Sequence, residues 1–595
     1  MTESSLTELL NHEELTGLTV LISDIMETVT ARQIKSLDTI PRKSRILGFG
    51  WSSPTIEPSQ STEPISSIQE NRNSVYHKDP HEIEGDIAPR IQEIKSAAIA
   101  SQDAWRTAFF QRIIQATHKE EKSNSTHSNA TETPKLNNIP LKPDGLRYWF
   151  PPISSSLPSL LTIEKRSLVI HAILLLAISL ETYDPRSRTL LLELCCSLHV
   201  PVSALLKQES ATARVLISSA KSSGNQPEDP TALTADSHVQ KRIEEGRSSQ
   251  RWKVGLATLG GALLVGVTGG LAAPLVAAGL GTLLSGIGLG GTVAAGYLGA
   301  MAASGPLIGG LFGAYGGNMS GNMMKRYAEQ VQDFAFLPLR PNQESKLRVF
   351  VCISGWLTNE DEIVSPWTAF SDYSSVYALR WEKKALLELG TALDTFVRQY
   401  AIGYIKSEII KRTVLASLWS ALWPVGLLKL GRVIDNPFNV AKARSDKAGL
   451  VLADAIIDRA QGRRPISLVG YSLGARVIYS CLLNLAERKA FGLVENAVLI
   501  GAPTPSTTES WALMRSVVGG RLVNVYSAED WVLGFMYRTS AIQLGVAGLQ
   551  QVEGVEQVEN FDVGDIVDGH LKYSESISQI LGRVLDADLA SVADR

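Results

Sequence analysis

Charge and cysteine are both scarce in this sequence of 595 residues, and each shortage excludes a class of function. The formal net charge is −3 at pH 7, so no basic surplus is available to neutralise nucleic-acid phosphates. The four cysteines, which include the adjacent Cys195 and Cys196, form neither an obvious disulfide framework nor a C-x-x-C metal motif. Residues 1–18 are acidic and lack the apolar core of a secretory signal. We therefore expect an intracellular protein with no nucleic-acid partner and no metal.

Charge is missing altogether from one long segment. Between Val254 and Met324 there are 71 residues without Asp, Glu, Lys, Arg or His, and 21 of them are glycine. This length suits two membrane-spanning helices of about 20 residues each and a turn. Glycines at every fourth position from Gly309 to Gly321 would lie on one helix face and let a second helix approach closely. Residues 251–327 are therefore predicted to form a glycine-rich hydrophobic hairpin in a membrane. The alternative is a glycine-rich helical pair packed against the domain that follows it, without crossing a membrane.

Basic residues flank this uncharged segment on both sides: Arg247, Arg251 and Lys253 precede it, and Lys325 and Arg326 follow it. Because positively charged flanks stay on the cytosolic side of a membrane, both ends of the hairpin are expected to face the cytosol. The hairpin would then anchor the chain in an intracellular membrane. Membrane lipid would be one partner, and the parts before and after the hairpin would lie on the cytosolic side.

The composition changes several times along the rest of the chain and predicts its organisation. Residues 50–85 and 119–145 are rich in Ser, Thr, Pro and Asn, which is typical of disordered segments and offers contacts for protein partners. We expect the following parts: a flexible N-terminal region (1–85), a helical domain (86–220) with a disordered insert (about 119–145), a linker (221–250), the hairpin (251–327), an α/β domain (340–580) and a tail (581–595).

Short apolar strand patterns alternate with helical patterns from about residue 345 to 580. The expected strands are 347–354, 376–381, 465–469, 496–503 and 521–527. Such alternation predicts an α/β fold in which helices cover a mostly parallel sheet. Sheets of this kind bind ligands at the carboxyl ends of their strands.

The segment Gly470-Tyr471-Ser472-Leu473-Gly474 lies between one of these strands and a helical pattern. A nucleophilic serine in an α/β enzyme stands at such a strand-to-helix turn, and the flanking glycines allow the close backbone approach that the turn requires. Ser472 is therefore the candidate nucleophile, with Gly470 and Gly474 as the glycines of its turn.

A serine nucleophile needs a histidine base and an acid, and in this architecture both follow the serine in the chain. Eight of the nine histidines precede residue 240, so His570 is the candidate base. Asp530 follows the expected strand 521–527 and is the favoured acid. The alternatives for the acid are Glu529, Asp562, Asp565 and Asp568.

The negative oxygen formed during ester cleavage needs backbone N–H donors. Leu473, directly after the serine, would supply one donor. The turn Gly355-Trp356, at the carboxyl end of the expected strand 347–354, would supply the other.

An apolar insertion, residues 413–439, precedes the serine turn where a plain α/β domain needs less chain. Trp419 and Trp423 are one helical turn apart in it, and Pro424 follows them. Lids and membrane-docking helices have this composition, and so do core helices. Both interpretations stay open.

Several stretches together resemble one protein family: LVGYSLGARVIYSCL, VENAVLIGAP, VNVYSAEDWVLGFMYR and VGDIVDGHLKY. They resemble the α/β-hydrolase-like family of transmembrane and coiled-coil domain proteins of eukaryotes, over roughly residues 165 to 580. The resemblance implies a serine hydrolase whose nucleophile, acid and base fall on Ser472, Asp530 and His570. We expect a membrane-associated lipase or esterase that acts on acyl lipid esters without a cofactor. The alternative is a membrane-anchored adaptor or trafficking scaffold that uses the fold without catalysis.

Overall fold

The structure is a computed structural model. It describes residues 9–40, 43–44, 85–86, 88–118, 149–222, 305–312, 331, 333–340, 344–370, 372–404, 425–537 and 545–585. Several predictions lie outside the described residues: the insert 119–145, nearly all of the linker 221–250, most of the hairpin 251–327, the tail beyond residue 585, and the Trp419 and Trp423 part of the insertion.

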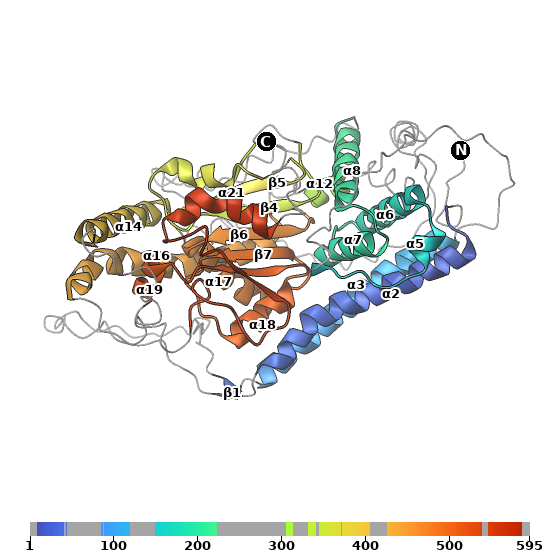
Figure 1. Ribbon diagram of the computed structural model, residues 1–595. Helices are drawn as coiled ribbons and strands as arrows, with labels where there is room; N and C mark the ends of the chain where they lie inside the picture. Colours follow the sequence, from blue (N-terminus) through green and yellow to red (C-terminus); the bar gives the residue numbers. More distant parts are fainter. Residues whose placement is uncertain are drawn as a thin grey trace, which may run out of the picture.

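A seven-stranded sheet forms the centre of the molecule (Figure 1). Its strands are β3 (Phe334–Pro338), β4 (Val349–Ile353), β5 (Ser375–Trp381), β6 (Ile466–Tyr471), β7 (Val494–Ile500), β8 (Leu522–Tyr526) and β9 (Val558–Asp562). Their order is β3-β5-β4-β6-β7-β8-β9, and all pairs are parallel except β3 with β5. Every residue of β4, β6, β7 and β8 is buried, as in parallel sheets covered by helices on both faces. The predicted α/β fold with a mostly parallel sheet is confirmed.

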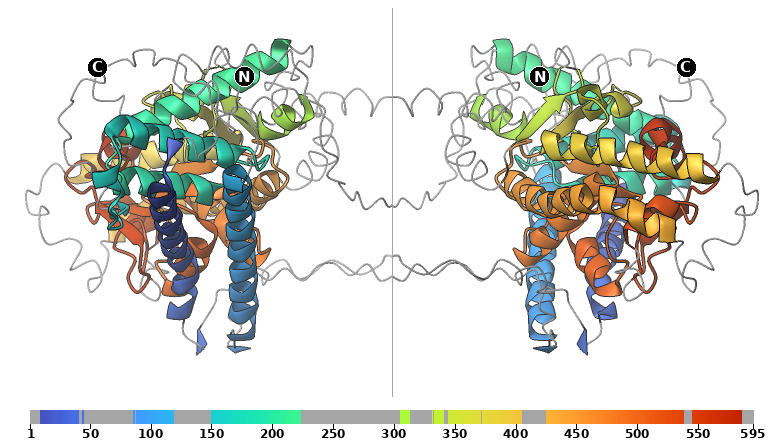
Figure 2. Two further views of the ribbon diagram at one scale, coloured as in Figure 1. Left: turned by 90° about the vertical axis from the view of Figure 1, so that its right-hand side faces the viewer. Right: turned by 90° about the vertical axis from the view of Figure 1, so that its left-hand side faces the viewer.

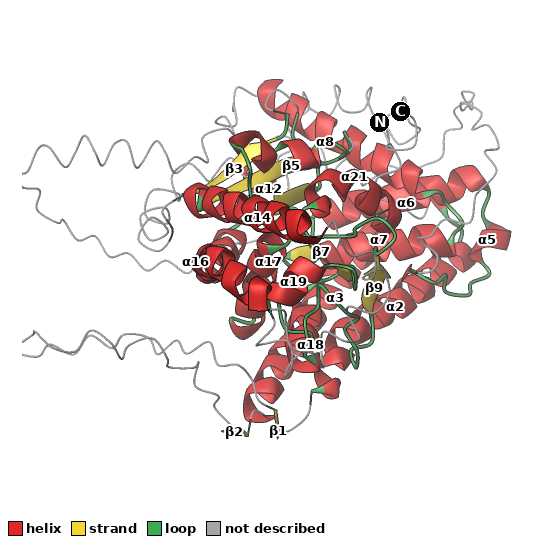
Figure 3. Cartoon of the chain, turned by 60° about the vertical axis from the view of Figure 1, so that its left-hand side comes forward, coloured by secondary structure: helices red, strands yellow, loops and turns green. Residues whose placement is uncertain are grey.

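Helices cover this sheet and connect its strands. They are α14 (Lys383–Tyr404), α16 (Val425–Ile457), α17 (Leu473–Glu487), α18 (Thr508–Val517), α19 (Trp531–Met536) and α21 (Lys572–Val584), with the short 3-10 helices η3 (Glu360–Ile363) and η4 (Ser365–Trp367). In Figure 1, α21 lies above the sheet, and α17 and α18 lie below it. Helices α14 and α16 run beside one another, as Figure 3 shows.

A second group of helices packs beside the sheet and has its own apolar core. Its members are α2 (His12–Ile34), α3 (Ala88–His118), α5 (Leu157–Leu160), α6 (Ile163–Ile178), α7 (Pro185–Ser197) and α8 (Val202–Ser222); the 3-10 helix η1 (Lys35–Thr39) continues α2, and β1 (Lys43–Ser44) pairs with β2 (Gly85–Asp86). The two long helices α2 and α3 lie side by side (Figure 2).

Helix α2 corrects the expectation of a flexible region over all of residues 1–85. Asn11 caps its first turn, because the Asn11 side chain accepts from the Glu14 N–H at 2.8 Å while the Glu14 carboxylate accepts from the Asn11 N–H at 2.9 Å. Its apolar stripe, which runs from Leu18 to Val29, is buried in the core of the helical group. Burial of this stripe gives residues 12–34 a fixed place in the fold.

Helix α12 (Gly305–Phe312) corrects one part of the expected membrane hairpin. Ile308, Leu311 and Phe312 are buried in the core of the helical group, and Arg464 donates to the Phe312 carbonyl oxygen at 3.2 Å. These eight residues therefore pack against protein, with their apolar side chains in the helical group. In the described parts of the chain, no helix combines the length and apolar character that a membrane span needs.

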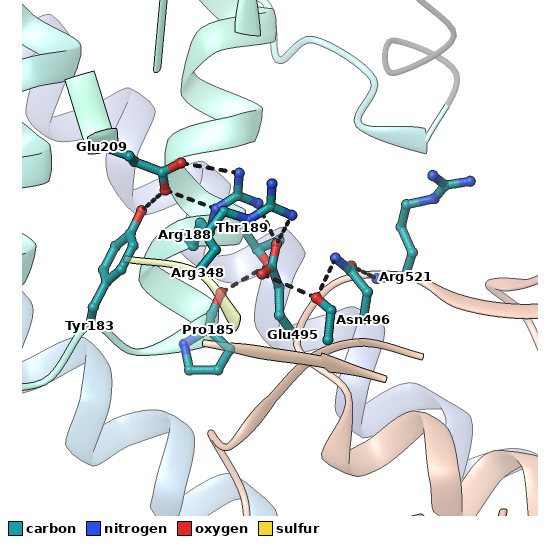
Figure 4. A network of polar contacts seen from close by, with 10 residues as sticks. Tyr183, Pro185, Arg188, Thr189, Glu209, Arg348, Glu495, Asn496 and Arg521 are labelled. Carbon is teal, nitrogen blue, oxygen red and sulfur yellow. Dashed lines mark hydrogen bonds and ion pairs between the residues drawn. The ribbon is translucent and has the colours of Figure 1, made fainter. Parts of the chain in front are cut away.

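A buried network of charges joins the helical group to the sheet (Figure 4). Arg188 of α7 pairs with Glu209 of α8 at 2.9 Å and also with Glu495 of β7. Arg348, directly before β4, lies 3.5 Å from the same Glu495 carboxylate, and Tyr183 donates to Glu209 at 2.6 Å. Because buried charges are stable only when they are paired, this network fixes how α7 and α8 sit against the amino ends of the strands.

Candidate active site

Ser472 stands at a sharp turn between β6 and α17. Its backbone angles, φ 53° and ψ −127°, fall in a region that residues other than glycine rarely adopt. The two strand-to-helix glycines are required by packing: a Cβ at Gly470 would lie 2.8 Å from the Gly474 carbonyl group, and a Cβ at Gly474 would lie 2.0 Å from the Ile353 carbonyl oxygen. The turn therefore holds Ser472 in a strained conformation that its neighbours enforce.

Ser472, His570 and Asp530 come from three separate segments and form a hydrogen-bonded chain. The distance from Ser472 Oγ to His570 Nε2 is 2.6 Å, and from His570 Nδ1 to Asp530 Oδ2 it is also 2.6 Å. With its proton on Nδ1, His570 donates to Asp530 and accepts from the Ser472 hydroxyl. This arrangement can remove the serine proton as the oxygen attacks an electrophile.

Asp530 is held from its other side as well. Its Oδ1 accepts from the Leu533 N–H at 3.0 Å, so the carboxylate caps helix α19 while it contacts His570. The alternative acids lie elsewhere: Glu529, Asp562 and Asp568 are exposed, and Asp565 pairs with Arg583 at 2.6 Å. Of the five candidates from the sequence, Asp530 is the one that contacts His570.

The turn after β4 lies directly against the serine turn. A Cβ at Gly355 would lie 2.5 Å from the Leu473 nitrogen and 2.7 Å from Ser472 Cβ. Glycine is thus needed where the two predicted oxyanion donors, Leu473 and the Gly355-Trp356 turn, approach one another.

Aromatic donors fix this second turn, residues 354–357, which we call the oxyanion loop after its predicted role. The Trp381 indole donates to the Ser354 carbonyl oxygen at 3.1 Å, and the Trp367 indole donates to Ser354 Oγ at 3.1 Å. The Tyr471 hydroxyl donates to the Trp356 carbonyl oxygen at 3.3 Å. The Trp356 indole is 3% exposed, yet its Nε1 has no hydrogen-bond partner among the described residues.

Two further residues at the site carry no local motif and were not predicted. Tyr573 lies edge-on to the His570 ring, with 5.6 Å between ring centroids, and occupies the space that a Cβ at Gly501 would need. Burial, reinforced by the charge of Asp530, raises the pKa of the Tyr573 hydroxyl well above its usual value. Arg476 donates to the Pro503 carbonyl oxygen at 2.9 Å and to Asp446 at 2.9 Å. Tyr573 follows His570 by three residues, and Arg476 follows Ser472 by four. This spacing is the one sequence signal that could have pointed to them.

The site is closed in this structure. Ser472 is 2% exposed, and His570 and Asp530 are fully buried. The described residues contain no cluster of His, Cys, Asp and Glu that could hold a metal ion.

Comparison with known proteins gives a family for this chain. Residues 247–586, more than half of the chain, match the family described as protein of unknown function (DUF726). An uncharacterised membrane protein of Schizosaccharomyces pombe is 43% identical over 440 residues, which cover 72% of this chain and 74% of that protein. No solved protein structure matches the chain.

Two other relatives carry informative names. The transmembrane and coiled-coil domain-containing protein STS1 of rice (Oryza sativa) is 39% identical over 368 residues, 59% of this chain and 56% of that protein. The probable lipase MIL1 of Saccharomyces cerevisiae is 34% identical over 461 residues, 76% of this chain and 42% of that protein. The chain thus spans about half the length of these two relatives. The predicted resemblance to transmembrane and coiled-coil domain proteins is confirmed, and by its family match and its similarity to the fission-yeast protein this chain belongs to the DUF726 family.

Proposed function

We propose that this chain is a serine hydrolase, a lipase or esterase that cleaves acyl esters at a membrane. One observation carries the proposal: the hydrogen-bonded chain from Ser472 through His570 to Asp530, which begins at a strained strand-to-helix turn. The strand order and this turn support an α/β-hydrolase-like fold. The name of the relative MIL1, a probable lipase, supports the same chemistry.

In the proposed reaction, Ser472 Oγ attacks the ester carbonyl carbon while His570 Nε2 takes the serine proton. Asp530 holds the imidazole and stabilises its charged form. The N–H groups of Leu473 and of the Gly355-Trp356 turn stabilise the negative oxygen. His570 then returns the proton to the departing alcohol, which leaves an acyl group on Ser472. Water, activated by His570, attacks that acyl group and releases the carboxylic acid.

The proposed substrates are acyl lipid esters, reached from the cytosolic surface of an intracellular membrane. The uncharged residues 254–304 support a membrane anchor, and the relatives named as membrane proteins agree with it. Residues 413–424 of the apolar insertion, which include Trp419 and Trp423, would contact lipid. Ile434 and Phe438, later in the same insertion, are buried in the core of the sheet.

The test is covalent labelling of the purified protein with a fluorophosphonate probe, together with turnover of esters of several chain lengths. We expect labelling at Ser472, and its loss in Ser472→Ala and His570→Ala. Each variant should lower ester hydrolysis by on the order of 10³-fold or more, and the double variant should lose little beyond either single one, because the residues act as a unit. Ser480→Ala, on the same helix but hydrogen-bonded to Asp446, is the matched control and should keep full activity.

One observation favours a second function, the adaptor or trafficking scaffold. Ser472 is only 2% exposed, so an ester reaches it only if the surrounding residues move, whereas a scaffold needs no access to Ser472. A scaffold predicts no labelling and no turnover, even with detergent or lipid present. It also predicts that Ser472→Ala fully restores the cellular phenotype of a deletion. That set of results would replace the hydrolase proposal.

A further inference from the structure

Helix α14 touches the oxyanion loop through its backbone. The Leu357 N–H, at the end of the loop, donates to the Leu386 carbonyl oxygen at 3.2 Å. One turn further along α14, a Cβ at Gly390 would lie 2.0 Å from the Leu357 carbonyl oxygen and 2.6 Å from its carbon. These atoms are backbone on both sides, so no side chain could rotate away to make room. Gly390 therefore sets how closely α14 and the loop approach.

The same helix also touches the segment that carries the acid. Phe396 is fully buried and stacks on Trp531, with ring centroids 5.8 Å apart, and on Phe535 at 5.0 Å. Trp531 directly follows Asp530 and is the first residue of α19. Trp531 also borders Gly569, the residue before His570, since a Cβ at Gly569 would lie 3.8 Å from the Trp531 indole nitrogen.

The two contacts are six residues apart on one helix, a span of about 9 Å. Leu386, Leu389, Leu393 and Phe396 are all buried in the core of the sheet, so α14 is packed along this whole span. The oxyanion loop and the Asp530 segment are separated by more than 170 residues in sequence, yet each rests on this one rigid element. The proposed second oxyanion donor, in the Gly355-Trp356 turn, and the acid Asp530 are thus both positioned by α14, which contains no triad residue.

We propose that α14 is the positioning element of the site: Gly390 sets the oxyanion loop and Phe396 sets the Asp530 segment. This inference rests on the proposed function. Displacement of Leu357 by a methyl group would move the Gly355-Trp356 donors away from the carbonyl oxygen of the substrate. The binding of the ester chain would be unaffected, so kcat should fall while KM stays near its original value.

The test compares Gly390→Ala with Gly582→Ala. Both replace a glycine inside a helix and gain similar intrinsic helix propensity, but a Cβ at Gly582 meets no atom within 4 Å. We expect Gly390→Ala to lower kcat on a short soluble ester by on the order of tenfold to a hundredfold and to slow fluorophosphonate labelling, with KM within about twofold. Gly582→Ala should match the original protein. Hydrogen exchange of the peptide covering residues 354–358 should speed up in Gly390→Ala alone.

Phe396→Leu tests the second contact, with Phe109→Leu as its control. Phe109 is a buried ring that stacks on Trp105 in the helical group, so its replacement removes similar packing far from the site. We expect a lower kcat in Phe396→Leu alone.

The inference is overturned if the original protein is labelled and active and both α14 variants keep kcat within about twofold. It is also overturned if each α14 variant loses no more kcat than its control. If the original protein shows neither labelling nor turnover, the proposed function fails. In that case, unchanged hydrogen exchange of residues 354–358 in Gly390→Ala would also overturn the proposed contact between α14 and the oxyanion loop.

Discussion

Trp356 combines two properties that seldom occur together in one side chain. It is almost completely buried, and its indole N–H has no partner among the described residues. A buried donor without an acceptor lowers stability by about 1–3 kcal/mol. The Trp356 backbone belongs to the proposed oxyanion loop, so we expect a substrate oxygen to accept from the indole N–H.

Replacement of Trp356 by phenylalanine separates these effects. The N–H donor is removed and the indole is replaced by a smaller phenyl ring, so relief of the unpaired donor offsets part of the lost packing. The melting temperature should therefore change little, while kcat/KM for esters should fall by roughly threefold to tenfold. Trp367→Phe is the contrasting variant, because it removes an indole that donates to Ser354 Oγ at 3.1 Å and should lower the melting temperature. Equal kcat/KM in Trp356→Phe and the original protein would show that this N–H does not touch substrate.

At the scale of the element, α7 meets α2 through a buried acid. Glu193 is fully buried and pairs with Arg32, and its second carboxylate oxygen has no hydrogen-bond partner among the described residues. Burial raises the pKa of Glu193 from 4.5 to about 7, against the opposing effect of Arg32. The folded protein therefore binds this proton more tightly than the unfolded chain does.

This difference predicts how the α2–α7 contact responds to pH. Between pH 4.5 and about 7 the unfolded chain releases the Glu193 proton while the folded protein keeps it, so this group's contribution to stability falls as pH rises and is constant above about 7. The loss is on the order of 3 kcal/mol. Glu193→Gln does not titrate. Its melting temperature relative to the original protein should therefore increase from pH 5 to pH 7, and parallel melting curves across that range would contradict the assignment.

The elements that could be predicted from sequence are those whose signal is local. The strands over 347–354 and 376–381 and the helix after Ser472 have apolar patterns of the correct period, and they correspond to β4, β5 and α17. Strands β3 and β9 were not predicted, because β3 is an edge strand and β9 reads Val-Glu-Asn-Phe-Asp, with few apolar residues. Helix α2 was not predicted, because the residues that bury its apolar stripe lie far along the chain, for example in α7.

The residues of the candidate site also fall into two groups: those that the sequence predicts and those that it does not. The order of Ser472, Asp530 and His570 could be derived because a mechanism dictates it, and the single late histidine left one choice of base. The supporting residues could not be found. Gly390 is required by its close approach to the Leu357 carbonyl oxygen, and Phe396 contacts the ring of Trp531, 135 residues away in the chain. Neither contact produces a pattern in the sequence.

At the scale of the whole molecule, the proposed membrane anchor covers fewer residues than the range 251–327 predicted from the sequence. Residues 305–312 belong to a packed core, so deletion of 254–324 would damage the fold as well as the anchor. Deletion of 254–304, which keeps α12, is the better variant. The original protein should stay with membranes through an alkaline carbonate wash, and this deletion should release it while fluorophosphonate labelling continues. Complete extraction of the original protein by carbonate would contradict an integral anchor.

The contact of α2 with α18 also determines when the protein can fold during its synthesis. Gln33 donates to the Val518 carbonyl oxygen and Ser36 donates to that of Ala512, across sequence separations of 485 and 476 residues. At a ribosomal rate of about 5–20 residues per second, α2 leaves the ribosome roughly 25 to 100 s before these acceptors exist. During that interval part of its docking surface has no partner on the nascent chain. A helix that is translated early is thus among the last described elements to complete its contacts, and chaperones have that long to act on it.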